Sequence, residues 1–350
     1  MKTPAFVCAC AAALAVSLNG CVKDPVSALR EVPVPSARGV YVVNQGNFGR
    51  ANSSLSYYDL VSFHVYNDVF TAVNGKNLGD VAQTMSIRGS SGYVVVNNSQ
   101  KIEIIDLATN LSTGTISTGP GSSPGQMAFV NDTLALVTDL YANALLVVNV
   151  AGRRVTGAVP VGANPAGIAI AGGKAYISNS GFGSGRTVSV VSLQSLSVLR
   201  TLTVGDYPGG VEVTPSGAVY VVCAGSYDFT NPANDTPARI MVIDTSSDTV
   251  TDSIFIGGHA TDIGIGIDGI GYVPSTTEVL RVDTRVHRVT GVFKEGAYFA
   301  VGVEAASGDV YLADPKNYIQ PGTVSVFAPN GQLRTQFDVG LIPGAFAFKR

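Results

Sequence analysis

Charged residues are scarce in this chain of 350 residues. Asp, Glu, Lys and Arg together make up 13 %, the formal net charge is −3, and no run of Lys and Arg is longer than two residues. Nucleic-acid binding depends on a basic patch or stripe, which this composition does not provide. The sequence therefore predicts no nucleic-acid partner.

Cysteine is sparse too. Cys8 and Cys10 fall in the first twenty residues, Cys21 follows them, and Cys223 alone lies in the rest of the chain, within the apolar run AVYVVCAG (218–225). One thiol can form neither an internal disulfide nor a cysteine-based metal cluster. In such a run we expect Cys223 to be buried and inert.

Hydrophobic residues, by contrast, make up 46 % of the chain, and there are 40 glycines. Disordered chains and coiled coils do not have this composition. Frequent Val, Ile, Thr and Ser together with many glycines are typical of short strands joined by tight turns. The composition therefore favours an all-β fold.

The first twenty residues have the pattern of a signal peptide. Lys2 supplies a positive start, and residues 4–18 form an apolar stretch that is too short to span a membrane comfortably. The stretch ends in LNGC (18–21), which resembles the lipobox of bacterial lipoproteins, in which the cysteine becomes the lipidated first residue. We expect Cys21 to be lipidated; the alternative is an ordinary signal peptide with an incidental cysteine.

Residues 21–38 contain three prolines and scattered charges, which predicts a flexible tether from Cys21 rather than a packed element. Acyl chains on Cys21 would anchor the protein without a spanning helix. Lys23 and Asp24 resemble the export tags of lipoproteins carried to the outer face of the outer membrane. The predicted location is therefore the cell surface, with the periplasmic face of the outer membrane as the alternative.

The remaining chain repeats itself. The stretch VGANPAGIAI (161–170) recurs as VGDYPGGVEV (204–213) and VGLIPGAFAF (339–348). Most copies are followed by an apolar run centred on Tyr or Val, a third run that ends in Asp or a small polar residue, and a fourth that leads back to Val-Gly. Four short strands that repeat every 40 to 50 residues or so are the signature of a β-propeller blade.

The ends of the chain fix the number of blades. Six complete units begin near residues 80, 124, 165, 208, 259 and 298, residues 39–70 hold only strands two to four, and PGAFAFKR (343–350) holds only strand one. Residues 39–350 are therefore predicted to form a seven-bladed propeller of four-stranded blades. The C-terminal strand would pair into the N-terminal blade and close the ring, which leaves no exposed sheet edge.

Several N-terminal motifs carry a resemblance to a known family. They are NQGNFG (44–49), SLSYYD (54–59), NDVF (67–70), NGKNLGDVAQTM (74–85) and NNSQKIEIID (97–106). With the repeated VG..P.G unit, this succession resembles the YncE-like propellers and, within them, the DUF5074 group of surface lipoproteins, which includes the BtuG-type proteins. Gln45 departs from the pattern, because the family motif has Glu there.

The resemblance implies a function. BtuG-type proteins capture cobalamin outside the cell and pass it to a TonB-dependent outer-membrane transporter, so this chain is expected to bind cobalamin or another corrinoid as a monomer. Cobalamin would be its ligand, and no cofactor is required. Two alternatives stay open: a module that binds a protein or glycan at the cell surface, and a metal-dependent lactonase or lyase.

In a propeller, the loops between strands two and three emerge on the same face as those that lead from strand four to the next blade. Here these loops carry aromatic side chains beside amides, which suits a flat, amphipathic ligand. Alternatively, the polar residues only form turns and the aromatic rings cover loop bases. The candidate ligand-binding residues are Asn47, Phe48, Asn98, Tyr141, Asn164, Phe182, Arg186, Tyr207, Tyr227, Phe229, Arg239, His259 and Tyr318.

Catalytic patterns are weak. Of His64, His259 and His287, only His259 falls in a loop of this face, and no serine or cysteine nucleophile can be assigned to it. Acidic residues that could approach the channel mouth form no recognisable metal-ligand spacing; they are Asp80, Asp139, Glu212, Asp262 and Asp314. We therefore expect a binding protein with no catalytic or metal-binding residues.

Overall fold

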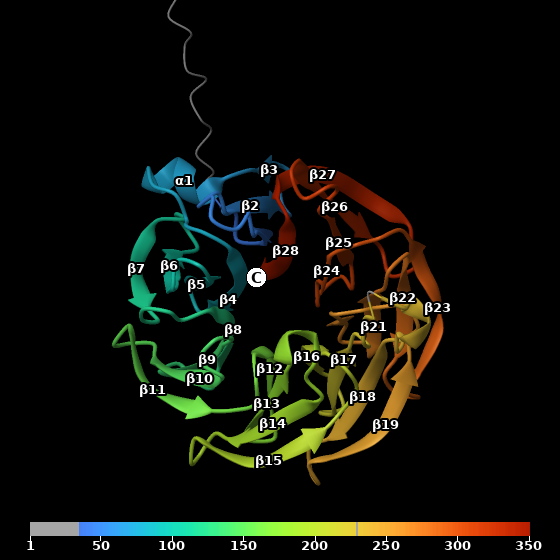
Figure 1. Ribbon diagram of the computed structural model, residues 1–350. Coiled ribbons are helices and arrows are strands. Elements are labelled where there is room, and N and C mark those ends of the chain that lie inside the picture. Colours follow the sequence, from blue (N-terminus) through green and yellow to red (C-terminus); the bar gives the residue numbers. More distant parts are fainter. Residues whose placement is uncertain (1–34, 229) are drawn as a thin grey trace, which may run out of the picture. The chain divides into compact units, whose positions relative to one another are not determined.

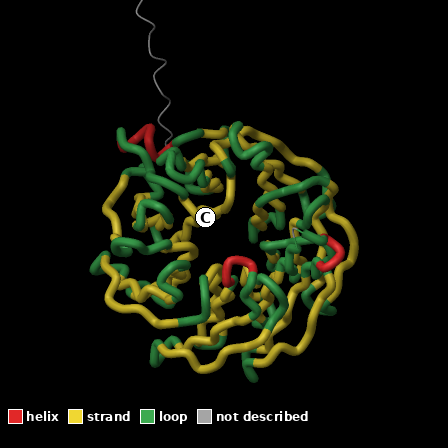
Figure 2. The backbone as a smooth tube through the Cα atoms, in the orientation of Figure 1, coloured by secondary structure: helices red, strands yellow, loops and turns green. Residues whose placement is uncertain are grey.

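The computed structural model describes residues 35–228 and 230–350 (Figure 1). The predicted signal peptide, Cys21 and most of the tether lie outside the described residues. The described chain forms seven antiparallel sheets of four strands each, arranged as blades around a central axis. Strands and the loops between them make up almost all of it (Figure 2). No helix of the described part is long and apolar enough to cross a membrane.

Blade 1 combines the two ends of the chain. From the centre outward it consists of β28 (Pro343–Lys349), β1 (Gly39–Asn44), β2 (Ser54–Asp59) and β3 (Val65–Tyr66). A short helix, α1 (Val69–Asn74), then leads to blade 2.

The other six blades each follow the chain from the centre outward. Blade 2 has β4 (Ala82–Arg88), β5 (Ser91–Val96), β6 (Lys101–Asp106) and β7 (Ser112–Ser117). Blade 3 has β8 (Pro124–Phe129), β9 (Leu134–Asp139), β10 (Ala144–Asn149) and β11 (Arg154–Pro160). Blade 4 has β12 (Pro165–Ala171), β13 (Lys174–Asn179), the single turn η1 (Gly181–Gly183), β14 (Thr187–Ser192) and β15 (Ser197–Thr203).

Blade 5 has β16 (Pro208–Val213), β17 (Val219–Cys223), η2 (Pro232–Asn234), β18 (Arg239–Asp244) and β19 (Thr249–Phe255). Blade 6 has β20 (Gly264–Ile265), β21 (Ile270–Pro274), β22 (Glu278–Asp283) and β23 (Arg288–Glu295). Blade 7 has β24 (Ala300–Val303), β25 (Val310–Asp314), β26 (Pro321–Phe327) and β27 (Leu333–Leu341). The prediction of seven four-stranded blades is confirmed.

The C-terminal strand closes the ring, as the sequence predicted. β28 pairs with β1 from Gly39↔Lys349 to Asn44↔Pro343, and the innermost strands of successive blades contact one another around the ring. Lys349 Nζ donates hydrogen bonds to the carbonyls of Ser36 (2.6 Å) and Leu107 (2.8 Å). The last strand is therefore bonded to residues of both blade 1 and blade 2.

The sixth blade differs from the expected repeat, because its innermost strand has only two residues and begins five residues later than predicted, at Gly264 instead of near residue 259. Asp262 Oδ1 accepts a hydrogen bond from the N–H of Ile263 (2.9 Å), and the carbonyl of Thr261 accepts one from the N–H of Gly210 in blade 5 (2.8 Å).

Buried hydroxyl groups join neighbouring blades near the joint prolines. β8 and β12 each contain a bulge directly after the proline. Thr138 Oγ1 accepts a hydrogen bond from the N–H of Gln126 in its own blade (2.9 Å) and donates one to Ala166 in blade 4 (3.1 Å). Ser178 Oγ likewise accepts from Gly167 (2.8 Å) and donates to Gly209 in blade 5 (2.6 Å).

Buried tyrosines in the second strands form another inter-blade contact. The hydroxyl of Tyr41 donates to Asn110 Oδ1 (2.6 Å), and that of Tyr176 donates to Asp248 Oδ1 (2.6 Å). Both acceptors lie in the outer hairpin of the next blade. The contact thus repeats with the blades and explains why the apolar runs are centred on tyrosine.

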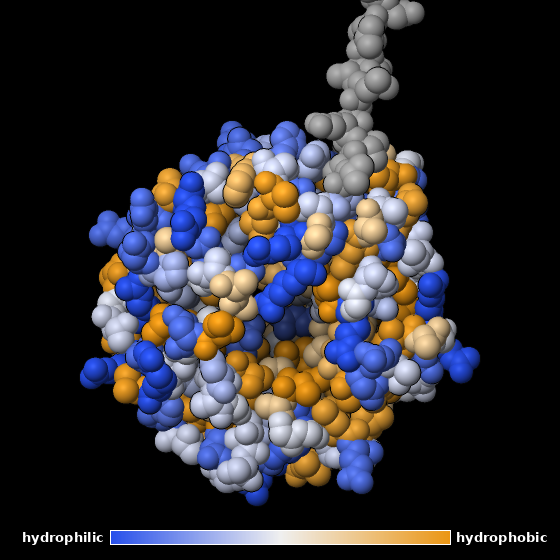
Figure 3. Space-filling model, turned by 180° about the vertical axis from the view of Figure 1, so that it is seen from behind, coloured by the Kyte–Doolittle hydropathy of each residue, from blue (hydrophilic) through white to orange (hydrophobic). Residues whose placement is uncertain are grey.

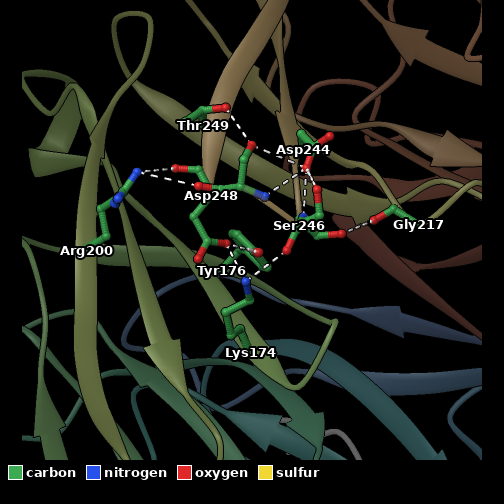
Figure 4. Close-up of polar contacts among 10 residues, drawn as sticks. Lys174, Tyr176, Arg200, Gly217, Asp244, Ser246, Asp248 and Thr249 are labelled. Carbon is green, nitrogen blue, oxygen red and sulfur yellow. Dashed lines mark hydrogen bonds and ion pairs between the residues drawn. The ribbon is translucent and has the colours of Figure 1, made fainter.

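Figure 4 shows this contact between blades 4 and 5. Lys174 Nζ donates to Asp248 Oδ1 (2.7 Å) and to the carbonyl of Thr245 (2.8 Å). Arg200 on the outermost strand donates to the carbonyl of Asp248 (3.2 Å). Because all of these side chains bond within the protein, we assign the cluster to stability rather than to ligand binding.

Candidate functional site

A cavity of about 370 Å³ opens at the end of the central channel where the loops between second and third strands lie. The hollow at the centre of the ring is visible from the side opposite Figure 1 (Figure 3). The lining of the 370 Å³ cavity, at the loop end of this channel, includes the side-chain amides of Gln45, Gln83, Asn97 and Gln126. Glycines of the innermost strands allow close packing beneath it: a Cβ on Gly209 would lie 2.8 Å from the carbonyl oxygen of Thr261.

Aromatic residues surround one side of this cavity. Phe182, from η1, and Tyr207, from the joint between blades 4 and 5, both line it. Tyr141 lies beside Phe182, with 6.1 Å between ring centroids, and the two residues are 61 % and 64 % exposed. Large exposed rings beside a cavity offer apolar surface to a ligand.

Two of these aromatic residues have a strained backbone. Phe182 and Tyr207 both have φ of 52°. Bulky side chains rarely adopt this left-handed region, and each such residue costs roughly 1–3 kcal/mol. Residues held in such conformations concentrate at functional sites. Tyr207 shares its backbone with Asn164 and Ile342, which also directly precede innermost strands, so Phe182 is the more specific indication.

The long loop at residues 225–238 is fastened beside the cavity. The rings of Tyr227 and His259 stack with centroids 3.8 Å apart and an angle of 19°. His259 Nδ1 lies 2.8 Å from the carbonyl oxygen of Ala224, and its Nε2 lies 3.7 Å from Asp235. The loop therefore packs against His259, the residue that the sequence predicted to lie at the channel mouth.

Further bonds hold the two ends of this loop. Asp206 forms an ion pair with Arg186 and accepts a hydrogen bond from Thr236 Oγ1 (2.8 Å). Within the loop, hydrogen bonds from Thr230 and Asn234 hold the pKa of Asp228 well below its usual range. The predicted ligand contact Phe229 lies outside the described residues.

A second aromatic group lies on blades 1 and 7, apart from the cavity lining. Phe48 is 74 % exposed, and the ring of Tyr318 contacts that of Phe299 at 6.0 Å. Asn47 Nδ2 donates to the carbonyl of Tyr318 (2.8 Å) and so joins the loops of the two blades. The predicted residues Asn47, Phe48 and Tyr318 thus form a group of their own.

Three other predicted residues bond within the protein and do not line the cavity. Asn98 donates to Asp80 (2.6 Å), Asn164 donates to the carbonyl of Leu140 (2.9 Å), and Arg239 packs over the ring of Phe255 at 5.5 Å. Phe255 ends the outermost strand β19, so Arg239 lies toward the rim of the blade.

Sequence reasoning missed most of the channel lining, because it searched loops, whereas Gln83 and Gln126 lie in innermost strands. A signal was present: Met85 and Met127 occupy equivalent register positions, and the residues directly before them, Thr84 and Gln126, are both polar and both line the cavity. A repeated polar residue in an otherwise apolar inner strand is typical of a side chain that faces the channel rather than the core.

A second cavity, of about 390 Å³, continues the channel toward the other face. It contains Glu212 and Asp262. Both carboxylates reach solvent in the channel, yet the ring around them displaces much of their hydration. Burial, reinforced by the charge of Asp262, raises the pKa of Glu212 to about 7. Burial also raises the pKa of Asp262 to about 6, although a hydrogen bond from the backbone N–H of Ile263 acts in the opposite direction and lowers this pKa.

The other acidic candidates have structural roles. Asp80, Asp139 and Asp314 accept hydrogen bonds from the backbone N–H groups of residues 49, 123 and 316, respectively. Cys223 is buried, as predicted, and burial raises the pKa of its thiol to about 12. Within residues 35–228 and 230–350, no group of three or more His, Cys, Asp or Glu is placed to hold a metal ion.

Solved structures confirm the fold. Hydrazine synthase from Kuenenia stuttgartiensis is similar, with a TM-score of 0.62 and 16 % identity over 75 % of this chain and 87 % of that one. A quinoprotein alcohol dehydrogenase-like protein from Bacteroides thetaiotaomicron is also similar, with a TM-score of 0.69 and 14 % identity. The likeness covers 90 % of this chain and 79 % of that one. At these identities the likeness extends to the fold alone.

No curated protein matches the sequence. Residues 38–246 match the family described as "domain of unknown function (DUF5074)". The matched region runs from β1, the second strand of blade 1, to the outer hairpin of blade 5, so it includes Phe182, Tyr207 and the long loop. The family suggested by the N-terminal motifs is therefore correct, and this chain belongs to the DUF5074 family.

Proposed function

We propose that this protein is a binding protein that captures a small amphipathic ligand at the channel mouth, and that the ligand is cobalamin or another corrinoid. The observation that carries the proposal is the cavity bordered by Phe182 and Tyr207, two aromatic residues in strained conformations, and lined by side-chain amides. The BtuG-like motifs in the sequence support the corrinoid identity.

The shape of the site supports a ligand that lies across the mouth. Its volume of about 370 Å³ is near the lower end of the range for small-molecule pockets. A broad, flat molecule would therefore rest on the exposed rings of Tyr141 and Phe182, with one of its groups in the cavity. Amide side chains in the lining can hydrogen-bond polar substituents of such a molecule.

The lipobox-like sequence supports the rest of the proposal, which is that Cys21 anchors the protein to the outer membrane and that the ligand passes to a TonB-dependent transporter. A lipid-anchored propeller on a tether can present its loop face to a neighbouring membrane protein. Labelling of intact cells with a membrane-impermeant reagent tests the surface location. If the protein is labelled only after the cells are lysed and not in intact cells, the periplasmic face would be favoured.

Variants of two phenylalanines test the binding site. Phe182→Ala should weaken cyanocobalamin binding by about tenfold, because an aromatic contact of this kind contributes on the order of 1–2 kcal/mol. Phe63 is a matched control: it is 72 % exposed, has φ of 58°, and lies in the β2–β3 turn at the other end of the blade. If Phe63→Ala weakened binding as much as Phe182→Ala, the site would be misplaced.

The second aromatic group favours an additional role in binding a protein or glycan. Phe48, Tyr318 and Ile319 are exposed on the loop face but do not line the cavity. A Phe48→Ser, Ile319→Ser variant should keep its affinity for cyanocobalamin while it loses any macromolecular partner. Loss of cyanocobalamin binding in this variant would instead assign the group to the ligand site.

A further inference from the structure

The two cavities form one channel with charge of a single sign. They share Thr84, Gln126, Asp262 and Gly344. Among the described lining residues, the only side chains that carry charge near neutral pH are Glu212 and Asp262. Neither forms an ion pair within the described chain, so the negative charge of the channel is not neutralised.

The two carboxylates lie near each other where the inner cavity begins. Asp262 lies two residues before the short strand β20 and packs against blade 5, where a Cβ on Gly210 would lie 2.9 Å from Asp262 Oδ1. Glu212 follows Gly210 by two residues on the same strand, β16. The charge of Asp262 contributes to raising the pKa of Glu212, which is consistent with this proximity.

Uncharged side chains with free hydrogen-bonding capacity line the mouth of the channel. Gln45 and Gln83 line the mouth and are half-buried, and within the described residues their side-chain amides have no hydrogen-bond partner. Amides of this kind can bond a neutral polar group that descends from the mouth. The channel therefore combines neutral donors and acceptors at its opening with negative charge from Asp262, which lines both cavities, and from Glu212, which lines the inner one.

We propose that the channel selects by charge, so that the part of the ligand that enters it is neutral or cationic, and that Glu212 and Asp262 are the specificity-determining residues that reject carboxylate and phosphate groups. This inference rests on the proposed function, because it concerns the same site. A cleft lined by one sign of charge within low-dielectric walls focuses the electric field and changes local ion concentrations by about 10- to 1000-fold.

Thiol-modification rates test this selection without any ligand. Ala345 lines the inner cavity, and an Ala345→Cys variant provides a reactive thiol there; the native Cys223 is only 1 % exposed. The rates of a cationic and an anionic methanethiosulfonate reagent of similar size are compared at the same pH. Because the thiolate fraction is the same for both reagents, it cancels in their rate ratio.

At about pH 8 we expect the ratio of the cationic rate to the anionic rate at Ala345→Cys to be about tenfold higher, or more, than the same ratio at Ser195→Cys. Ser195 is an exposed control in the β14–β15 turn. Adding Glu212→Gln and Asp262→Asn should bring the ratio to within about twofold of that control. Acidification to about pH 5 should also lower the ratio, because both carboxyl groups then take up protons.

Equal rates for the two reagents at about pH 8 would overturn the charge selection, as would a channel thiol that reacts with neither reagent. A thermal melt of the Glu212→Gln, Asp262→Asn variant checks that its ring is intact. Because no corrinoid is used, this test can fail while cyanocobalamin binding persists, and it can succeed where cyanocobalamin does not bind. The two proposals are therefore tested separately.

Discussion

Aromatic rings beside the cavity, rather than backbone strain alone, separate the candidate site from the ordinary turns and joints of the blades. Tyr207 shares its positive φ with Val81, Asn164 and Ile342, which also directly precede innermost strands. Residues with left-handed backbone (positive φ) also occur in the outer hairpins, at Arg153, Leu196 and Asp248, where the turn geometry accounts for them. Phe182 places an exposed aromatic ring beside an open cavity, and the half-buried ring of Tyr207 lines the same cavity. A glycine would adopt the same backbone without strain, so the aromatic side chains serve something other than the local fold.

Phe182→Gly therefore separates stability from binding. We expect the melting temperature to stay unchanged or to rise by about 1–2 °C, because glycine removes the left-handed strain. Affinity for cyanocobalamin should fall by about tenfold as the ring is lost. Phe63→Gly should have the same effect on melting and none on affinity. A large drop in melting temperature for Phe182→Gly would show that its ring supports the fold.

The acidic pair predicts a dependence of stability on pH. Glu212 binds its proton more tightly in the folded chain than in the unfolded chain, so its contribution to stability is present at acid pH and is lost as the pH rises through about 7. Glu212→Gln removes this loss. At about pH 8 the variant should melt about 2 °C above the natural protein, and at about pH 5 the two should melt at the same temperature. The difference at about pH 8 is small because solvent in the channel screens the charge.

Glu295→Gln, an exposed change at the end of β23, is the matched control for this comparison. Its effect on the melting temperature should be the same at both pH values. If Glu212→Gln showed no greater pH dependence than Glu295→Gln, the two channel carboxylates would not be coupled to folding.

At this scale the sequence located the site only in part. Phe182 and Tyr207 could be identified because they are aromatic residues in loops of the predicted face. Asn98 and Asn164 were predicted on the same ground, yet their amides bond to Asp80 and Leu140. Whether a loop amide faces a ligand or its own backbone depends on local geometry that residue type does not specify.

At the scale of elements, buried hydroxyls compensate for the bulges that the joint prolines introduce. Thr138 and Ser178 each accept a hydrogen bond from their own blade and donate one to the next. Strand positions were predictable from the repeat, but these bonds were not, because a serine in a strand pattern looks the same whether or not it spans two blades.

Ser178→Ala tests this contact. The fully buried hydroxyl leaves two backbone groups without a partner when it is removed, so the free energy of unfolding should fall by about 1–3 kcal/mol. Urea unfolding measures the change. Ser195→Ala, in an exposed turn, should change the free energy of unfolding by less than about 0.5 kcal/mol. Equal effects of the two variants would mean that the inter-blade bonds contribute little.

At the scale of the whole molecule, the two chain ends are joined in one blade. β28 pairs with β1 and contacts the innermost strands of blades 2 and 7. The sequence predicted this closure because the first unit lacked its first strand and the last piece consisted of nothing else. Ring closure matters for function, since the cavity is lined by residues of blade 1, including Gln45 and Gly344.

A chain that ends at Leu341 should therefore be destabilised by several kcal/mol, because it loses the inner strand of blade 1 and exposes the edge of β1. Circular dichroism during heating would show a much lower or less cooperative transition. Deletion of the exposed Arg350 alone should have no effect. If the shorter chain melted like the complete one, closure by β28 would not be needed for stability.

The central claim, that the loop face of the propeller binds a corrinoid at the channel mouth, is tested most directly by calorimetric titration of the chain without residues 1–21 with cyanocobalamin. We predict one ligand per chain with a dissociation constant of about 1 μM or lower, and an affinity about tenfold weaker in Phe182→Ala. Absence of binding heat at several temperatures, with the ring intact by thermal melting, would contradict the claim and favour a macromolecular partner for this face.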